Sequence, residues 1–358
     1  MNDHLIFAAV SYSLIVELSN ILRSVPTVMN VPFSRISGTG SALPARRVDN
    51  QEVADLVGKD SSYIFRVSGI RTRYWAEQQD DCSSLAEQAA RQALDQAGMT
   101  PHDLDAIIVS TTSPDMIFPS TACLLQARLG VTGIPAFDCS ASCSGFLYGL
   151  SMADCFLRAG QFQRCLVVAS EVKSRSLDCE DLSTAILFGD GAGAAILERS
   201  TYPDHGIVSI RHHADGQHHD LVKISGGGSR QPLSQAVLDD WAHTLRIQGS
   251  MLYRIAIRRL QQAVVEHLAE EQWPIAELDQ VIFHQANGRM IARLGRMLGI
   301  ATERCVNIIE QVGNTSSASL PMALDHANRN QRLLKGSRIL LGTFGGGLTW
   351  GTALIRWS

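Results

Sequence analysis

Two spacings of apolar residues alternate along most of the chain. In Ser84–Gly98 (SLAEQAARQALDQAG) apolar residues recur at helical spacing, whereas Asp103–Ser110 (DLDAIIVS) is a short β-rich run. Similar segments follow one another from Pro32 to the C-terminus, with glycine and proline between them. This order predicts an α/β fold. Near-continuous apolar runs such as AIIV and CLVVA are typical of parallel strands that are covered on both faces.

The second half of the pattern repeats the first. The helical segment and the strand with a Leu-Asp entry recur as Leu260–Gln272 and Glu277–His284 (ELDQVIFH), and each strand is followed by a helix that ends in Leu-Gly. Further on, RCLVVA (164–169) matches RILLG (338–342), and GAAIL (193–197) matches GTALI (351–355). The matched order predicts two pseudo-symmetric halves that share helices between two sheets. We expect the active site at strand carboxyl ends, at the seam between the halves.

The predicted organisation has three parts: an extension at 1–31, a first half at 32–204 that carries a nucleophilic cysteine, and a second half at 205–358. Within the extension, the largely apolar run Leu5–Val16 is too short to span a bilayer. It follows Asp3 and His4 rather than the positive charge of a signal peptide. We therefore interpret the extension as lying outside the core fold, and membrane attachment is not expected.

Composition narrows the class of protein. Of 358 residues, 45% are apolar and 18% are charged, so the chain can build a large core. The net charge is −4 and the basic residues are scattered, which argues against nucleic acid as a partner. The eight cysteines form no CxxC pair, and a disulfide framework is not expected in a chain of this size. We expect a cytoplasmic protein.

Unusual residues lie where the predicted strands end. Cys143, in AFDCSASCSG, precedes a helical pattern, so the helix dipole is expected to lower the pKa of its thiol, while Cys139 is expected to pack inside the strand. His284 ends the repeated strand in FHQANGRM, and Asn314 is the amide of GNTSSASLP. The glycines of TFGGGLTWG (343–351) allow the backbone to approach a ligand closely. Each feature alone is also compatible with a structural role.

Together these features have one chemical logic. A thiolate can accept an acyl group from a thioester. His284 and Asn314 can donate hydrogen bonds to a thioester carbonyl that becomes an enolate, and backbone N–H groups of Cys143 and the glycine loop can hold a tetrahedral oxyanion. These groups are what decarboxylative carbon–carbon bond formation requires.

The phrases DCSASCSGFLYGL, FGDGAGAAIL, FHQANGRM, GNTSSASLPMAL and FGGGLTWG, in this order, closely resemble the β-ketoacyl-acyl-carrier-protein synthase III family over about residues 33–358. The resemblance implies a homodimer with the five-layered αβαβα thiolase fold. It also implies an enzyme without metal or cofactor that loads an acyl group from coenzyme A or acyl carrier protein and condenses it with malonyl-acyl-carrier protein, initiating fatty-acid synthesis. The resemblance implies a catalytic triad of Cys143, His284 and Asn314 and an oxyanion hole formed by Cys143 and Gly346. It implies an acyl pocket with Phe118, Gly345 and Gly347, in which Phe118 reaches into the partner subunit. The residues that it implies for binding the thioester carrier are Tyr63, Ser250, Asn287 and Arg289.

Three positions depart from the family pattern. Tyr63 stands where the family has a tryptophan, Leu182 where it has an arginine that grips adenine, and Ser250 where it has a phosphate-contacting asparagine. These departures predict weakened binding of coenzyme A with the chemistry intact.

Other interpretations stay open at this point. The same fold could serve a secondary pathway, such as quinolone or alkyl-resorcinol assembly, or it could form a non-catalytic acyl-binding protein. The histidine-rich stretch His212–Asp220 is a weak metal candidate, because its histidines are adjacent in pairs rather than at ligand spacing.

Overall fold

The computed structural model describes residues 33–200, 202 and 205–358; the predicted extension lies outside these residues. Two sheets form the core. The first has the order β1-β7-β6-β4-β5 and the second the order β11-β12-β13-β8. In the first sheet β5, β4 and β6 run parallel and β7 is antiparallel to β6; in the second, the edge strand β11 is parallel to β12 and β13 is antiparallel to β12. The strands are β1 (Phe33–Ala42), β4 (Ala106–Ser110), β5 (Ala136–Cys139), β6 (Arg164–Glu171), β7 (Gly191–Ser200), β8 (Gly206–Ala214), β11 (Gln280–Phe283), β12 (Arg338–Gly345) and β13 (Thr349–Arg356).

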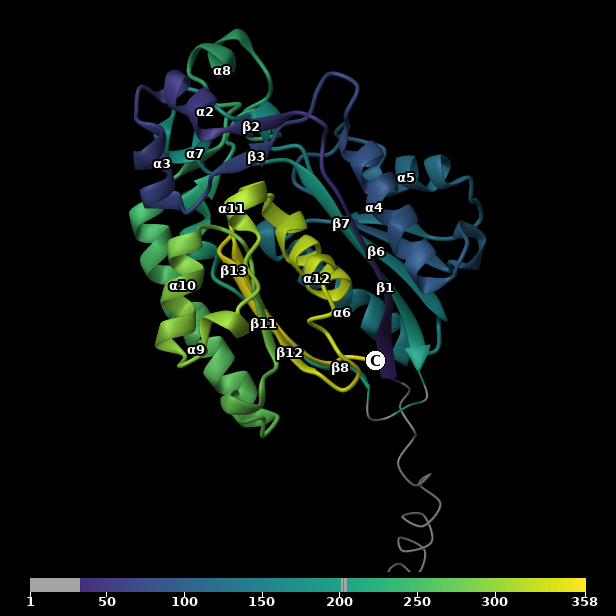
Figure 1. Cartoon of the computed structure of the whole chain (residues 1–358). Helices are drawn as coiled ribbons and strands as arrows, with labels where there is room; N and C mark the ends of the chain where they lie inside the picture. Colours follow the sequence, from purple (N-terminus) through teal and green to yellow (C-terminus); the bar gives the residue numbers. More distant parts are fainter. Residues whose placement is uncertain (1–32, 201, 203–204) are drawn as a thin grey trace, which may run out of the picture.

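Helices cover the sheets in three layers, as Figure 1 shows from the blue helices on one side to the green helices on the other. The helices α4 (Cys82–Ala97) and α5 (Thr121–Leu129) lie outside the first sheet. Between the sheets lie α6 (Gly145–Arg158) and α12 (Ser319–Arg329), and α9 (Gly249–Glu270) and α10 (Gly288–Met297) lie outside the second. The result is the predicted five-layered arrangement of two pseudo-symmetric halves.

The predicted apolar strands are buried. Ile107, Ile108 and Val109 of β4 and Val167 and Val168 of β6 have no exposed surface, as expected for strands covered on both faces. The packing is also close, because a Cβ at Gly38 of β1 would lie 2.1 Å from the Ala93 carbonyl oxygen of α4.

One helix begins earlier than its pattern predicts. Apolar spacing marks Leu260–Gln272, whereas α9 begins at Gly249. Its first turns carry Leu252 and Tyr253, which line a cavity and are only partly buried against the core. A helix that changes its environment along its length does not keep one apolar face, so the periodicity reveals only the half that packs against the sheet.

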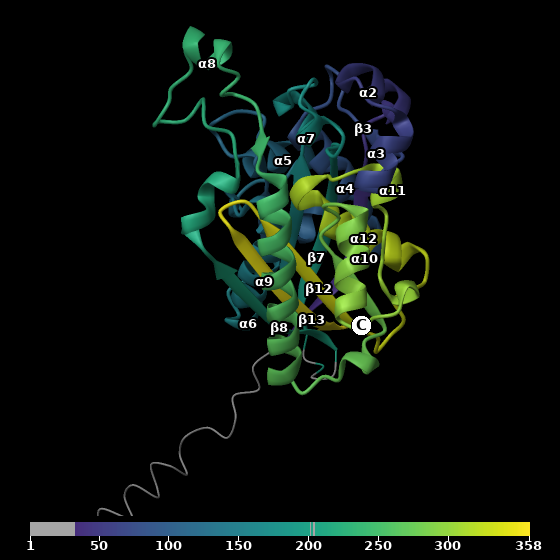
Figure 2. The same cartoon turned by 90° about the vertical axis from the view of Figure 1, so that its left-hand side faces the viewer.

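Short elements gather above the carboxyl ends of the central strands, at the top of Figure 2. They are β2 (Arg47–Asp49), β3 (Thr72–Tyr74), α2 (Asn50–Val57), α3 (Ser61–Ser68), α7 (Leu182–Ala185), β9 (Val222–Lys223), α8 (Gln235–Asp239), β10 (Arg246–Ile247) and α11 (Ile309–Val312). Single-turn 3₁₀ helices occupy further connections, among them η2 (Ser142–Ser144) and η7 (Ser316–Ala318). None of the helices in the described ranges combines the length and apolar character needed to cross a membrane.

Candidate active site

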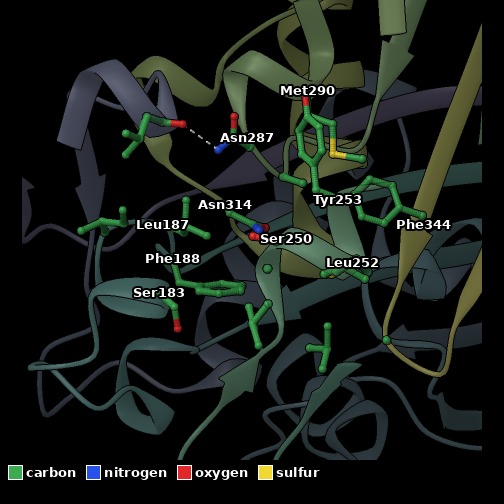
Figure 3. A pocket seen from close by; sticks show the side chains of 18 of the residues that line it. Ser183, Leu187, Phe188, Ser250, Leu252, Tyr253, Asn287, Met290, Asn314 and Phe344 are labelled. Carbon is green, nitrogen blue, oxygen red and sulfur yellow. Dashed lines mark hydrogen bonds between the residues drawn. The ribbon is translucent and has the colours of Figure 1, made fainter. Parts of the chain in front are cut away.

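A cavity of about 890 Å³ opens where the two halves meet. Cys143, His284 and Asn314 all line it, so residues that are far apart in the sequence share one site. Figure 3 shows Asn314 and Ser250 among the side chains that line the cavity, together with Phe344 of β12. Most of the remaining wall is apolar, with contributions from Leu187, Phe188, Leu252, Tyr253 and Met290.

Cys143 lies in η2, between the end of β5 and the start of α6. The second half contacts the backbone of this turn: the Thr343 hydroxyl donates to the Cys143 carbonyl oxygen at 2.9 Å. Gly345 approaches even more closely, since a Cβ there would lie 2.6 Å from the Cys143 nitrogen. The glycine therefore lets the two backbones approach more closely than any other residue would allow.

The environment of the Cys143 thiol differs from the sequence-based expectation. Burial raises the pKa of the thiol, an effect that the Ser316 hydroxyl and the positive charge of Lys173 oppose and that Glu171 reinforces. The sequence-based expectation of a lowered thiol pKa is therefore wrong. Desolvation disfavours the charged form of a buried group, and here it outweighs the contributions of Ser316 and Lys173.

His284 immediately follows β11 and is buried, 3% exposed. Burial lowers its pKa to about 3, so the imidazole is neutral at neutral pH. Its Nδ1 lies 2.5 Å from Ser319 Oγ, and this hydroxyl accepts the Gln285 N–H at 3.1 Å. The hydroxyl can donate its own proton to Nδ1, and the ring then carries its proton on Nε2.

Asn314 precedes η7 and is also buried. Its Oδ1 accepts the Ser316 N–H at 2.9 Å, and its backbone N–H donates to the Leu187 carbonyl oxygen at 2.8 Å. Because the amide oxygen is used in this way, the Nδ2 group is the end that can donate to a ligand in the cavity. His284 and Asn314 thus both offer neutral donors.

The other predicted site residues are not all at the cavity. Tyr63, Ser250, Asn287, Gly345 and Gly346 line it, whereas Gly347 and Arg289 do not. Asn287 also begins α10 by accepting the Arg289 N–H.

Arg289 is exposed beside α3. Its guanidinium donates to the carbonyl oxygens of Phe65 and Arg66, and it lies 5.4 Å from the Phe65 ring centroid. It therefore closes the carboxyl end of α3 while it remains on the surface. Phe118 is 82% exposed and Ile117 is 92% exposed, and neither lines the cavity.

Sequence reasoning missed the polar side chains behind the triad. Ser316, Ser319, Glu171 and Lys173 are all buried next to it. Glu171 follows the apolar run RCLVVAS, and a charged residue at the end of such a strand was the signal that could have revealed this group. Among the described residues, no group of three or more His, Cys, Asp or Glu side chains is arranged to hold a metal ion.

A five-layered fold with a cysteine, a neutral histidine and an asparagine around one apolar cavity defines the class of thiolase-fold condensing enzymes. Comparison with known proteins then places the chain within this class. Two family profiles match: 3-oxoacyl-[acyl-carrier-protein (ACP)] synthase III at residues 137–216, and its C-terminal region at 268–357.

The chain is 46% identical to the β-ketoacyl-[acyl-carrier-protein] synthase III of Methylococcus capsulatus over 325 residues, which are 91% of this chain and 99% of that protein. The crystal structure of the Aquifex aeolicus 3-oxoacyl-[acyl-carrier-protein] synthase III superposes with a TM-score of 0.84 at 37% identity, covering 90% of this chain and 100% of that one. The priming β-ketosynthase of the R1128 polyketide pathway gives 0.85 at 31% identity, over 93% and 98%. The chain belongs to the β-ketoacyl-acyl-carrier-protein synthase III family and is a condensing acyltransferase.

Proposed function

We propose that Cys143 carries the acyl group. Its thiolate attacks the carbonyl carbon of an acyl thioester, the bond to the donor sulfur breaks, and the departing thiolate takes up a proton. The backbone N–H groups of Cys143 and Gly346 are the donors for the tetrahedral oxyanion, because Gly345 keeps the glycine loop against the backbone of Cys143. Cys143 is the nucleophile because it combines access to the cavity with this close backbone support.

His284 and Asn314 serve the second half-reaction. Malonyl-acyl-carrier protein binds with its thioester carbonyl between the two donors, and loss of CO₂ leaves an enolate that they stabilise. The enolate carbon attacks the acyl-Cys143 carbonyl, the carbon–sulfur bond breaks, and the cysteine thiolate is restored. A neutral His284 suits this role, because its Nε2–H donates without giving up a proton to the enolate.

The observation that carries this proposal is the meeting of Cys143, His284 and Asn314 at one cavity from three separate segments. The test follows β-ketoacyl-acyl-carrier protein and CO₂ from an acyl thioester panel and malonyl-acyl-carrier protein. The wild type should form both products and Cys143→Ala neither, while the matched variant Cys139→Ala should retain activity because Cys139 lies in β5 outside the cavity lining. Activity in Cys143→Ala would overturn the proposal.

We further propose that the enzyme is a cytoplasmic homodimer that works with acyl carrier protein and needs no cofactor. The exposed loop with Ile117 and Phe118 is suited to enter a partner subunit, since exposed large apolar side chains mark interfaces. The exposed Arg289 and Arg296 lie on the outer helix α10, where they could meet an acidic carrier protein.

The donor should be a carrier-protein thioester or a longer acyl chain rather than acetyl-coenzyme A. Tyr63, Leu182 and Ser250 all line the cavity, so the three departures from the family pattern lie at its wall. The Arg66 guanidinium already lies 5.4 Å from the Tyr63 ring centroid, and Leu182 offers neither charge nor a planar face. Stacking and cation–π contacts are each worth about 0.5–2 kcal/mol. Losing one or two of them costs about 1–3 kcal/mol and weakens coenzyme A binding roughly tenfold to a hundredfold.

The measurement is kcat/KM for acetyl-coenzyme A, medium-chain acyl-coenzyme A and acyl-carrier protein. Leu182→Arg should raise the value for acetyl-coenzyme A about tenfold, and the matched Leu182→Met should not. A wild type that prefers acetyl-coenzyme A by a wide margin would contradict this assignment of the donor.

A further inference from the structure

A buried polar chain connects the Cys143 sulfur to a pair of opposite charges. Cys143 Sγ lies 3.5 Å from Ser316 Oγ, and the Ser316 hydroxyl donates to Glu171 Oε1 at 3.2 Å. Lys173 Nζ lies 3.2 Å from Glu171 Oε2. Glu171, Lys173 and Ser316 are 0%, 4% and 2% exposed, so water does not screen the charges.

The Glu171 carboxylate accepts further hydrogen bonds besides the one from Ser316. Ser317 Oγ donates to Oε1 at 2.7 Å and Ser113 Oγ to Oε2 at 2.6 Å. Burial opposes the ionisation of Glu171, but Lys173 and these donors outweigh it and lower the pKa of the carboxyl. Glu171 therefore stays ionised and satisfied even when the Ser316 hydroxyl turns away from it.

The single hydroxyl proton of Ser316 has two acceptors within reach. While Cys143 is a thiol, its S–H can donate to Ser316 Oγ, and the Ser316 proton points to Glu171. When Cys143 is a thiolate, the hydroxyl can turn and donate to the sulfur, since a hydrogen bond to a charged acceptor is the stronger one. Lys173 cancels the charge of Glu171, which would otherwise oppose the thiolate.

We propose that Ser316 is a positioning residue for Cys143, and that Glu171 and Lys173 are the buried, mutually neutralised pair that holds its hydroxyl within reach of the sulfur. The proposal rests on Cys143 as the nucleophile of the proposed function. It adds three residues to the site, at the end of β6 and in η7, that support the acyl-loading step through the cysteine.

Few other charged or titratable groups face Cys143. His284 shares the cavity and is neutral, and Asp181 and Arg254 line its wall. The strands β12 and β13 and the helix α6 contact η2 with uncharged residues, since Arg338, Arg356 and Arg158 stand at their opposite ends. The charges most directly coupled to the sulfur are therefore those of Glu171 and Lys173.

The test measures the rate at which iodoacetamide alkylates Cys143 between pH 6 and 10, by peptide mass spectrometry, on variants whose folding is checked by circular dichroism. Ser316→Ala should alkylate about tenfold more slowly and with a higher pH midpoint, because the thiolate loses a charge-assisted donor. The matched Ser317→Ala removes a bond to the same Glu171 oxygen but no contact with the sulfur, and its rate should stay within about twofold of wild type.

Charge variants give a second, independent readout. Lys173→Met should raise the midpoint by about one pH unit, and Glu171→Gln/Lys173→Met should bring it back towards the wild-type value. Acyl loading should fall in parallel, whereas malonyl decarboxylation should persist, because the Ser316 backbone N–H still holds Asn314. The proposal is overturned if folded Ser316→Ala and Ser317→Ala share the wild-type midpoint. The proposed function fails separately, if wild-type Cys143 is never acylated.

Discussion

The two halves of the molecule place different residues at equivalent points, and the active site arises from these differences. The strands β6 and β12 each have eight residues that begin with arginine, and they end at Glu171 and Gly345 respectively. The turns η2 and η7 directly precede the central helices, and each begins with a serine of positive φ, Ser142 at 51° and Ser316 at 53°. By this correspondence Cys143 is the counterpart of Ser317.

The end of each of these strands, β6 and β12, packs against the turn before the other half's central helix, and we call this contact a crossing. In the crossing at β6, the strand ends in a carboxylate, and Ser317 of η7 donates to Glu171. The crossing at β12 is open in that its strand ends in a glycine without a side chain, which lies against the backbone of Cys143 in η2. At the end of the parallel strands, Ser110 of β4 corresponds to His284 after β11. The duplicated fold thus has one crossing with a buried carboxylate and one open crossing without a side chain at the strand end. We assign the chemistry to the open crossing, which contains Cys143.

Converting His284 into its counterpart is expected to have the largest effect. His284→Ser, like Asn314→Ala, should slow malonyl decarboxylation by about 10²–10³, because each removes a donor to the developing enolate. Acylation of Cys143 should persist, since neither side chain contacts the leaving donor in that step. Separate assays of loading and of CO₂ release make the distinction, and an equal loss in both would contradict the division of roles.

Adding a side chain at the open crossing is expected to have the second-largest effect. Gly345→Ala would bring a Cβ to 2.6 Å from the Cys143 nitrogen, so the turn that carries the nucleophile must shift. A misplaced nucleophile should lower the rate of acyl loading by roughly tenfold to a hundredfold. Gly346→Ala is the matched control, because its Cβ would find its nearest atoms at 3.3 Å. Burst kinetics of acyl loading should rank the wild type first, Gly346→Ala second and Gly345→Ala last. Equal rates of acyl loading for the two variants would show that the close approach of Gly345 to Cys143 is unimportant.

A buried neutral histidine should make stability depend on pH. The pKa of His284 is about 3 in the folded protein, against about 6.5 in the unfolded chain. Below pH 6.5 only the unfolded chain gains this proton, so the contribution is present above pH 6.5 and is lost as the pH falls towards 3. Between pH 7 and pH 5 the wild type should lose about 2 kcal/mol more than His284→Ser. Guanidinium unfolding at both pH values measures the difference, and parallel losses would place the protonated group elsewhere.

The smallest expected effect concerns the exposed loop. Phe118→Ala should change the preferred acyl chain length by a few fold and leave the stability of the isolated subunit nearly unchanged, because Phe118 is 82% exposed there. Light scattering and acyl-chain profiles of the two proteins provide the measurement. A wild type that is monomeric and fully active would remove the partner-subunit role of Phe118.

The sequence was sufficient for the repeated elements and for the meeting of Cys143, His284 and Asn314 at one cavity. Hydrophobic runs reveal the strand ends before Cys143 and His284, whereas Asn314 was expected at a strand end and follows the short helix α11 instead. Glu171 also ends an apolar strand, but its contact with Ser316 joins η7 to β6 and no local pattern records that contact. The pKa of Cys143 was mispredicted for the same reason: the helix end is visible in the sequence, but the burial that raises the pKa depends on both halves.

The most direct test of the account is mass spectrometry of the purified protein after incubation with acyl thioesters of different chain length and carrier. If the reaction begins at the open crossing, the wild type and Ser317→Ala should each carry one acyl group per chain, mapped to the peptide with Cys143. Cys143→Ala should carry none. An acyl group on another residue, or an undiminished acyl group on Cys143→Ala, would contradict the claim that the reaction begins at Cys143.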